Sequence, residues 1–258
     1  MTRGFVIMAQ DTEKVSYTNC AKALEISIKR VMPNANVTII TTDMLPHGDV
    51  APDSDWKLAN DWQVYEASPY DETIKLEADM FIPRNIDYWW NVLCLKDMVV
   101  CNKIRDFKGE ISTARGYRRF IDDNNLPDLY NAITYFKKSD TAEQFFKIVR
   151  NVFENWEEYK SILKCNQNEK VTTDWAYAIA GHIIGIEKIT LPTFNDFSMT
   201  HMKQFINGLP GEDWTQVLIY ECLPESLRIS TFVQMYPLHY HIKSFSDKLL
   251  ETYTWKTL

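Results

Sequence analysis

Apolar and polar positions follow one another along the first part of the chain in a pattern typical of a strand, a helix and a second strand. Residues 4–10 are almost all apolar, which indicates a strand buried on both faces, as in a parallel sheet covered by helices. From residue 16 to residue 32, apolar positions recur at spacings of three and four and predict an amphipathic helix. Residues 36–43 are rich in β-branched side chains and predict the second strand. This order predicts a right-handed βαβ unit of an α/β protein.

The remainder of the chain continues this alternation of strands and helices. The strand pattern recurs over residues 73–83, 97–101 and 131–136, and the helical pattern over residues 60–67, 86–95, 141–159 and from residue 174 onward. No linker rich in Gly, Ser or Pro divides the chain, and the sequence contains no internal repeat. We therefore predict a single domain over residues 1–258.

The predicted strands end in polar residues that are able to bind a ligand. Glu77 and Asp79 follow one strand, and because residues two apart in an extended chain point to the same side, this pair is suited to hold one divalent cation. Gln10 and Asp43 follow the two strands of the βαβ unit. Ligands of open α/β sheets bind beyond the carboxyl ends of the strands, so we expect these residues at one crevice. Ordinary polar positions at a strand end would explain the carboxylate pair equally well.

Composition narrows the class of protein. A length of 258 residues with 45% hydrophobic residues is enough for a large buried core. No apolar run is long enough to span a membrane and the N-terminus shows no secretory signal, so we expect a cytoplasmic protein with no membrane partner. The five cysteines lack the spacing of a zinc or redox site.

The distribution of charge leaves one candidate surface for nucleic acid. The net charge of −7 argues against general binding to phosphate backbones, which depends on Lys and Arg. Between residues 103 and 119, however, basic and aromatic side chains interleave. The basic members are Lys103, Arg105, Lys108, Arg115, Arg118 and Arg119. This cluster indicates either a local basic groove or a solvated helix face.

Four stretches occur in the order in which GT-A glycosyltransferases carry their functional motifs, and the chain resembles that family over nearly its full length. The stretches are residues 4–43, residues 69–80 (Pro-Tyr-Asp-Glu-Thr-Ile-Lys-Leu-Glu-Ala-Asp-Met), residues 131–136 with residues 172–175, and residues 238–243 (Leu-His-Tyr-His-Ile-Lys). The resemblance implies a single-domain, Rossmann-like GT-A fold with a mixed sheet flanked by helices. It also implies an enzyme that binds a nucleotide sugar, expected to be UDP-linked, and a divalent metal.

The resemblance assigns a metal site to particular residues. It implies Mn²⁺ or Mg²⁺ with Asp79 as the first ligand, Glu77 as an auxiliary ligand, and an imidazole from His239 or His241. The first carboxylate of the family motif is usually Asp, and Glu77 stands in its place here. The two histidines are expected to share a face of an extended segment, so that one ring binds metal and the other touches phosphate. Two structural histidines on a strand are the alternative.

Further positions are expected to bind donor and acceptor. Lys243 would hold the β-phosphate as a point charge, and Asp174 would act as general base or orient the sugar hydroxyls. The expected nucleotide contacts are Ala9, Gln10, Tyr17, Asp43, Asn131 and Lys243. Asp61 and Gln63 stand where many relatives carry basic residues that face the diphosphate. A solvated lysine and a helix cap at Thr173 or Asp174 are the structural alternatives.

The acceptor is predicted from the size of the chain and its lack of membrane features. In both respects it is similar to small bacteriophage glycosyltransferases, some of which glycosylate hydroxymethylated pyrimidines in DNA. We therefore predict a hexosyl- or pentosyltransferase that acts on such DNA in the cytoplasm of an infected host cell, with the basic cluster of residues 103–119 facing the DNA. The alternatives are a polysaccharide, glycolipid or protein acceptor, a nucleotide-sugar-binding protein without transferase activity, and an interaction module.

Overall fold

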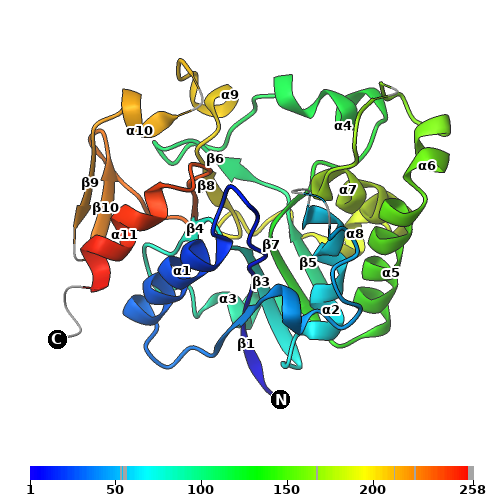
Figure 1. Cartoon of the computed structure of the whole chain (residues 1–258), viewed down its shortest axis with the longest axis horizontal. Coiled ribbons are helices and arrows are strands. Elements are labelled where there is room, and N and C mark those ends of the chain that lie inside the picture. The colour runs from blue at the N-terminus through cyan, green and yellow to red at the C-terminus, as the bar shows by residue number, and fades with distance from the viewer. Residues whose placement is uncertain (53, 55–56, 167, 212, 224, 255–258) are drawn as a thin grey trace.

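A five-stranded mixed sheet runs through the centre of the molecule (Figure 1). The structure is a computed structural model and describes residues 1–254 except 53, 55, 56, 167, 212 and 224. In spatial order the strands are β2 (Val37–Ile40), β1 (Arg3–Met8), β3 (Glu72–Glu77), β7 (Tyr130–Lys137) and β5 (Met98–Cys101). Strand β1 pairs in parallel with β2 and β3, whereas β7 runs antiparallel to β3 and β5. The predicted α/β class with a mixed sheet is confirmed.

Helices and two small sheets surround the central sheet (Figure 1). The helices of the described residues are α1 (Tyr17–Val31), α2 (Val64–Ala67), α3 (Trp89–Leu93), α4 (Arg119–Asp123), α5 (Asp140–Glu154), α6 (Trp156–Ile162), α7 (Thr173–Ile184), α8 (Ile186–Ile189), α9 (Gln204–Asn207), α10 (Trp214–Val217) and α11 (Phe245–Thr254), with 3₁₀ turns η1 (Thr42–Met44), η2 (Lys57–Gln63) and η3 (Gly116–Arg118). One small sheet has the order β4 (Met80–Phe81), β12 (Leu238–His239), β8 (Met199–His201) and β6 (Ile104–Arg105), and the other the order β11 (Phe232–Val233), β10 (Ser226–Ile229) and β9 (Tyr220–Leu223). Within the described part of the chain, no helix combines the length and apolar character needed to cross a membrane.

Both faces of the central sheet are covered, which explains the unbroken apolar run of β1. Phe5 and Ile7 pack into one core with residues of α1 and α3. Val6 packs into a second core with residues of α5 and α7. A strand directs successive side chains to opposite faces, so two buried faces require apolar residues at every position. A third core joins α11 to the smaller sheets.

The structure corrects two predicted helices. The helix predicted over residues 141–159 is interrupted at Asn155, whose φ of −118° and ψ of 32° lie outside the helical region. Helices α5 and α6 are therefore separate. The helix predicted over residues 60–67 begins as the 3₁₀ turn η2 and becomes α-helical only in α2. The helix predicted from residue 16 to residue 32 is confirmed as α1.

The strand predicted over residues 73–83 is divided between two sheets. Strand β3 ends at Glu77 in the central sheet, and the chain then passes through Asp79 into β4 of the four-stranded small sheet. There β4 pairs with β12 in a register that sets Met80 opposite His239. This change of sheet places the carboxylate of Asp79 beside a strand that lies about 160 residues later in the chain.

Gly4 in β1 leaves room for the ring of Tyr70, whose hydroxyl is 2.7 Å from the hydroxyl of Thr38. A Cβ atom at this glycine would lie 2.4 Å from two ring carbons. We expect Gly4→Ala to lower the free energy of unfolding by about 1–3 kcal/mol, because the ring and its hydrogen bond must shift. Gly116→Ala is the matched control, since a Cβ there meets nothing within 4 Å. Equal losses for the two variants in urea denaturation would contradict this packing account.

Candidate functional site

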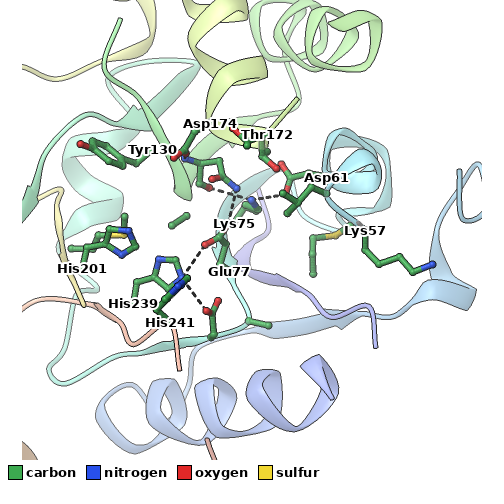
Figure 2. Close-up of a pocket in the computed structure, with 18 of the residues that line it drawn as sticks. Lys57, Asp61, Lys75, Glu77, Tyr130, Thr172, Asp174, His201, His239 and His241 are labelled. Atoms are coloured by element: carbon green, nitrogen blue, oxygen red, sulfur yellow. Dashed lines mark hydrogen bonds and ion pairs between the residues drawn. The ribbon is translucent and has the colours of Figure 1, made fainter. Parts of the chain in front are cut away.

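A cavity of about 570 Å³ opens at the carboxyl ends of β1 and β3 (Figure 2). The central strands, the start of α7 and the segment that follows β12 all contribute to its wall. The polar lining residues include Gln10, Tyr17, Asp61, Lys75, Glu77, Asp79, Arg118, Asn131, Thr173, Asp174, His201, His239, His241 and Lys243. This is the edge of the sheet at which the sequence predicts a ligand site.

Asp79 lies among basic side chains in this cavity. Its Oδ2 atom is 3.0 Å from His239 Nε2 and 2.5 Å from Lys243 Nζ. Burial raises the pKa of the Asp79 carboxyl, but the charges of His239 and Lys243 outweigh this effect and hold that pKa well below its usual range. Burial likewise lowers the pKa of Lys243, and the Asp79 carboxylate more than offsets it, so that the pKa of the lysine is raised. The two side chains therefore form an ion pair at neutral pH.

His239 and His241 approach Asp79 from different backbone conformations. His239 lies on β12, whereas His241 has a φ of +63°, in the left-handed region that residues other than glycine rarely adopt. The predicted extended conformation is therefore wrong at His241, where the chain turns, although the rings of His239 and His241 both approach Asp79. Burial first, and then the neighbouring Lys243 and His239, lower the pKa of His241 to about 4, so its ring is neutral at neutral pH.

Asp79, His239 and His241 form a group that fits a divalent cation. One carboxylate oxygen and one nitrogen from each ring all lie within 4.8 Å of one another. Metal bonds to such ligands are about 2.0–2.2 Å long, so ligand atoms that share one cation lie within about 4.4 Å, close to this spacing. The Nδ1 atom of His239 is also buried, with no hydrogen-bond partner among the described residues. Glu77 is not a member of this group: its Oε1 atom accepts a 2.8 Å hydrogen bond from Asn131 Nδ2, while its Oε2 atom lies 3.3 Å from His239 Nε2.

The sequence does not reveal an ion pair in the wall formed by β3. Lys75 Nζ is 2.6 Å from Asp61 Oδ1 and donates to Asn131 O at 3.1 Å (Figure 2). Tyr177 donates its hydroxyl hydrogen to Asp61 Oδ2 at 2.8 Å. The side chain of Lys75 is fully buried and that of Asp61 is 9% exposed. Because Lys75 neutralises Asp61, this ion pair adds no net charge to the cavity.

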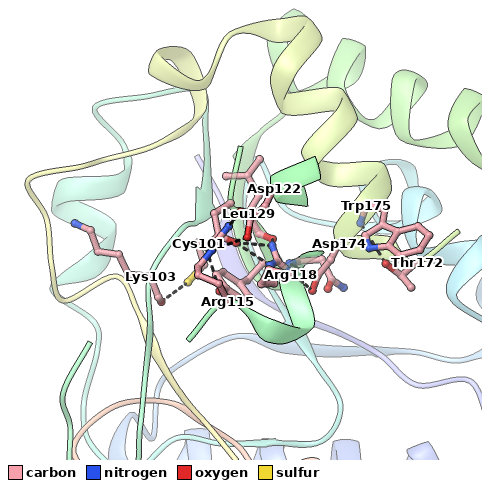
Figure 3. A network of polar contacts seen from close by, with 12 residues as sticks. Cys101, Lys103, Arg115, Arg118, Asp122, Leu129, Thr172, Asp174 and Trp175 are labelled. Carbon is pink, nitrogen blue, oxygen red and sulfur yellow. Dashed lines mark hydrogen bonds and ion pairs between the residues drawn. The ribbon is translucent and has the colours of Figure 1, made fainter. Parts of the chain in front are cut away.

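Asp174 is held by two hydrogen-bond donors at the start of α7 (Figure 3). Its Oδ2 atom accepts from Arg118 Nη1 at 2.8 Å, and its Oδ1 atom accepts from the Asn131 N–H at 3.0 Å. The cap of α7 is Thr172, so the predicted caps Thr173 and Asp174 are wrong. Because Thr172 caps the helix, the carboxylate of Asp174 is available to line the cavity.

The predicted basic surface over residues 103–119 is not continuous. The side chains of Arg105 and Arg118 are buried, with 8% and 3% of each residue exposed. Arg115 and Arg119 are exposed but pair with nearby carboxylates. Guanidinium groups turn inward here because their five donors find carbonyl and carboxylate acceptors in the protein. This stretch therefore offers less open positive charge than its sequence indicates.

The residues predicted to bind the nucleotide fall into two groups. Those that line the cavity are Gln10, Tyr17, Asn131 and Lys243. Ala9 is buried beside the cavity, and its N–H donates to the strand β2. Asp43 is exposed and outside the lining, where its Oδ1 atom accepts from the Thr41 hydroxyl. The expectation that all strand ends meet at one crevice does not hold for Asp43, because η1 turns the chain away after β2.

His201 is a further cavity residue for which the sequence offers no local signal. The parallel pairing of β8 with β12 sets it opposite His239, and the two rings stack with centroids 4.6 Å apart. Burial, and then the charge of His239, hold the pKa of His201 well below its usual value. Its neutral ring therefore adds a third imidazole to this part of the cavity.

Comparison with known proteins identifies the fold. No protein-family model and no curated protein matches the chain. Among solved structures it is similar to the galactosyltransferase LgtC in complex with donor and acceptor sugar analogues, with a TM-score of 0.50 and 10% identity over 99% of this chain and 96% of LgtC. The chain thus has the mixed-sheet α/β fold of a GT-A-like glycosyltransferase, as the sequence predicts.

Two other solved glycosyltransferases are similar at lower scores. Mouse xyloside xylosyltransferase 1 has a TM-score of 0.46 and 11% identity, over 82% of this chain and 96% of the mouse protein. The WbbM bifunctional glycosyltransferase has a TM-score of 0.46 and 12% identity, over 78% of this chain. The chain spans 40% of the length of WbbM.

Proposed function

We propose that this protein is a metal-dependent glycosyltransferase that moves a sugar from a nucleotide diphosphate sugar to a hydroxyl group. The convergence of Asp79, His239, His241 and Lys243 on one cavity, in a fold shared with the galactosyltransferase LgtC, is the observation that carries the proposal. A nucleoside diphosphate departs only when its developing negative charge is stabilised. This group of side chains offers both a cation site and a fixed ammonium for that purpose.

Two kinds of side chain would stabilise the leaving group: ligands of a divalent cation and a lysine that contacts phosphate. Asp79, His239 and His241 would hold Mn²⁺ or a related divalent cation, with Glu77 3.3 Å from His239 Nε2 as an auxiliary carboxylate. When bound, such a cation acts as a Lewis acid towards the diphosphate. Lys243 would contact a phosphate oxygen as a point charge.

The rest of the cavity suits the nucleotide portion of the donor. Its volume of about 570 Å³ falls within the range of about 300–1,000 Å³ typical of small-molecule sites. We place the nucleotide against Gln10, Tyr17 and Asn131, all of which line the cavity. The ring of Tyr17 has its centroid 5.7 Å from Lys243 Nζ, so a base stacked on that ring would have its phosphates near the lysine.

Asp174 is proposed to orient sugar hydroxyls rather than to remove a proton. Arg118 and the Asn131 N–H already bond its two oxygens, and each oxygen keeps a lone pair for a sugar hydroxyl. We expect Asp174→Asn to lower kcat/KM about tenfold, mainly through KM, because the residue only orients the sugar. Loss of a general base would cost more, typically about 10²–10⁴-fold. The measurement is kcat and KM as a function of pH.

The control for this prediction shares the same arginine. Asp128 also pairs with Arg118 but does not line the cavity, so Asp128→Asn is expected to leave KM within about twofold. A fall in kcat of about a thousandfold in Asp174→Asn, with loss of the acidic limb of its pH profile, would assign the general-base role to Asp174 instead.

The proposed reaction is tested by mixing the purified protein with a panel of nucleotide diphosphate sugars, a divalent cation and candidate acceptors. Release of nucleoside diphosphate together with a mass gain of one sugar on an acceptor is the expected result. Binding of a nucleotide sugar in calorimetry with neither hydrolysis nor transfer would favour a non-catalytic binding protein. No binding of any nucleotide sugar would contradict the proposal altogether.

The acceptor panel includes DNA that contains hydroxymethylcytosine. The sequence predicts this acceptor, although the buried side chains of Arg105 and Arg118 give it no support from an open basic surface. A nucleoside mass gain after digestion of the DNA would establish it. Transfer of sugar to saccharide acceptors, with no mass gain on the hydroxymethylcytosine DNA, would exclude this acceptor. That result would support the polysaccharide or glycolipid alternative.

A further inference from the structure

His241 has a backbone conformation that its residue type rarely adopts. The Ile242 N–H donates to Tyr240 O at 2.7 Å and closes a three-residue turn centred on His241, whose φ is +63°. A three-residue turn with a positive central φ is the rare, strained form of the γ-turn. Glycine would adopt it without a steric penalty, so the imidazole at this position carries a conformational cost that other contacts must offset.

Hydrogen bonds of the Tyr240 backbone fix this turn against the cavity. The Tyr240 N–H donates to Asp79 O at 3.1 Å, and Trp214 Nε1 donates to Tyr240 O at 2.7 Å. The turn thereby brings a ring nitrogen of His241 within 4.8 Å of the ligand atoms of Asp79 and His239. Strained residues that persist in this way cluster at functional sites.

We propose that His241 is a second imidazole ligand, which makes the site select a first-row transition ion over Mg²⁺. This inference deepens the proposed metal-dependent function and rests on it. Mg²⁺ prefers oxygen ligands and retains several waters, whereas ions such as Co²⁺ and Zn²⁺ bind imidazole nitrogen well. Glu77, the second carboxylate, lies outside the group that converges: its Oε1 atom accepts from Asn131 Nδ2, and its Oε2 atom is 3.3 Å from His239 Nε2. The group itself contains two imidazoles and one carboxylate.

The test measures binding of Co²⁺ and of Mg²⁺ to the protein by calorimetry, with no sugar donor present. The wild type is expected to bind Co²⁺ at least about a hundredfold more tightly than Mg²⁺. His241→Asn is expected to reduce this preference at least about tenfold, by weakening Co²⁺ and leaving Mg²⁺ nearly unchanged. Asn tolerates the left-handed conformation, so the turn should survive. The visible absorption bands of bound Co²⁺ give a second readout and are expected to change when the nitrogen ligand is lost.

Four further variants separate ligation from surface binding and from strain. His47 pairs with Glu66 at 2.8 Å outside the cavity, so His47→Asn is expected to keep the full Co²⁺ preference. Ser230 has a φ of +53° outside the cavity lining, and Ser230→Gly should raise the unfolding midpoint without affecting metal binding. His241→Gly should unfold at a higher midpoint than His241→Ala, because only glycine relieves the strained turn.

The outcomes are distinguishable from those that test the transferase. Unchanged Co²⁺ and Mg²⁺ affinities in His241→Asn, or an equal loss of Co²⁺ binding in His47→Asn, would overturn the ligand assignment even if sugar transfer is observed. The expected preference in a protein that transfers no sugar would support the cation site and contradict the proposed reaction. Equal affinities of the wild type for both ions would also overturn the inference.

Discussion

Replacement of Asp79 by Asn is expected to lower kcat/KM for sugar transfer by about a thousandfold while the protein stays folded. Removing one preorganised group that stabilises transition-state charge typically costs about 10²–10³-fold. Asp79 serves two such groups, because its Oδ2 atom contacts both His239 and Lys243. The neutral amide keeps the shape of the side chain but removes the charge that would hold the cation and the ammonium. Steady-state kinetics, with the unfolding midpoint as a check on folding, measures the effect.

Glu77→Gln is the matched control for the Asp79 variant. Glu77 lies two residues earlier, and its contact with Asn131 Nδ2 can be kept by the glutamine oxygen. Because Glu77 is outside the group formed by Asp79, His239 and His241, we expect a loss of about tenfold or less. Activity above a tenth of wild type in Asp79→Asn, or an equal loss in both variants, would show that Asp79 is not the principal carboxylate.

Lys75→Met is expected to lower the free energy of unfolding by about 3–5 kcal/mol, the usual cost of removing one partner of a buried ion pair. The lysine is fully buried, and its loss leaves Asp61, 9% exposed, with the hydroxyl of Tyr177 as its remaining side-chain donor in the described structure. The penalty arises chiefly from the unpaired buried carboxylate and not from lost attraction alone. Urea denaturation with a two-state fit measures it.

A second lysine and a double variant test the cause of this loss. Lys147 forms an exposed pair with Glu143 at 2.5 Å, so Lys147→Met is expected to cost less than about 0.5 kcal/mol. In the double variant Lys75→Met with Asp61→Asn no charge is left unpaired, and most of the stability should return. A double variant that is as unstable as Lys75→Met would assign the loss to packing of the lysine stem instead.

The central sheet is predictable because its signals are local. The apolar run of residues 4–10 requires a strand buried on both faces, and the spacing of apolar residues from 16 to 32 requires an amphipathic helix. Boundaries are less predictable, because Asn155 interrupts an amphipathic pattern that continues on both sides of it. The spacing of apolar residues therefore does not predict where such a helix ends.

The site is only partly predictable, for reasons that differ among its residues. Asp79 stands out as a carboxylate at the end of an apolar strand, which is a sequence-level signal. Lys75 alternates with apolar residues and so resembles an exposed strand position. In the folded protein α7 packs on that face of the sheet, and Lys75 is buried in an ion pair with Asp61. Arg118 belongs to a basic run that is typical of an exposed surface. Its guanidinium is nevertheless buried, because it donates hydrogen bonds to Asp174 and to Leu129 O on other segments.

The amino-acid sequence alone determined the α/β class, the βαβ unit at the start and the candidate status of Asp79, since each depends on residues that are neighbours in the chain. Only the tertiary structure decided how the other residues are used. The pairing of β4 with β12 and a strained turn bring His239 and His241 to Asp79 across about 160 residues. Contacts between segments that distant depend on the packing of the whole chain, and no local pattern specifies them.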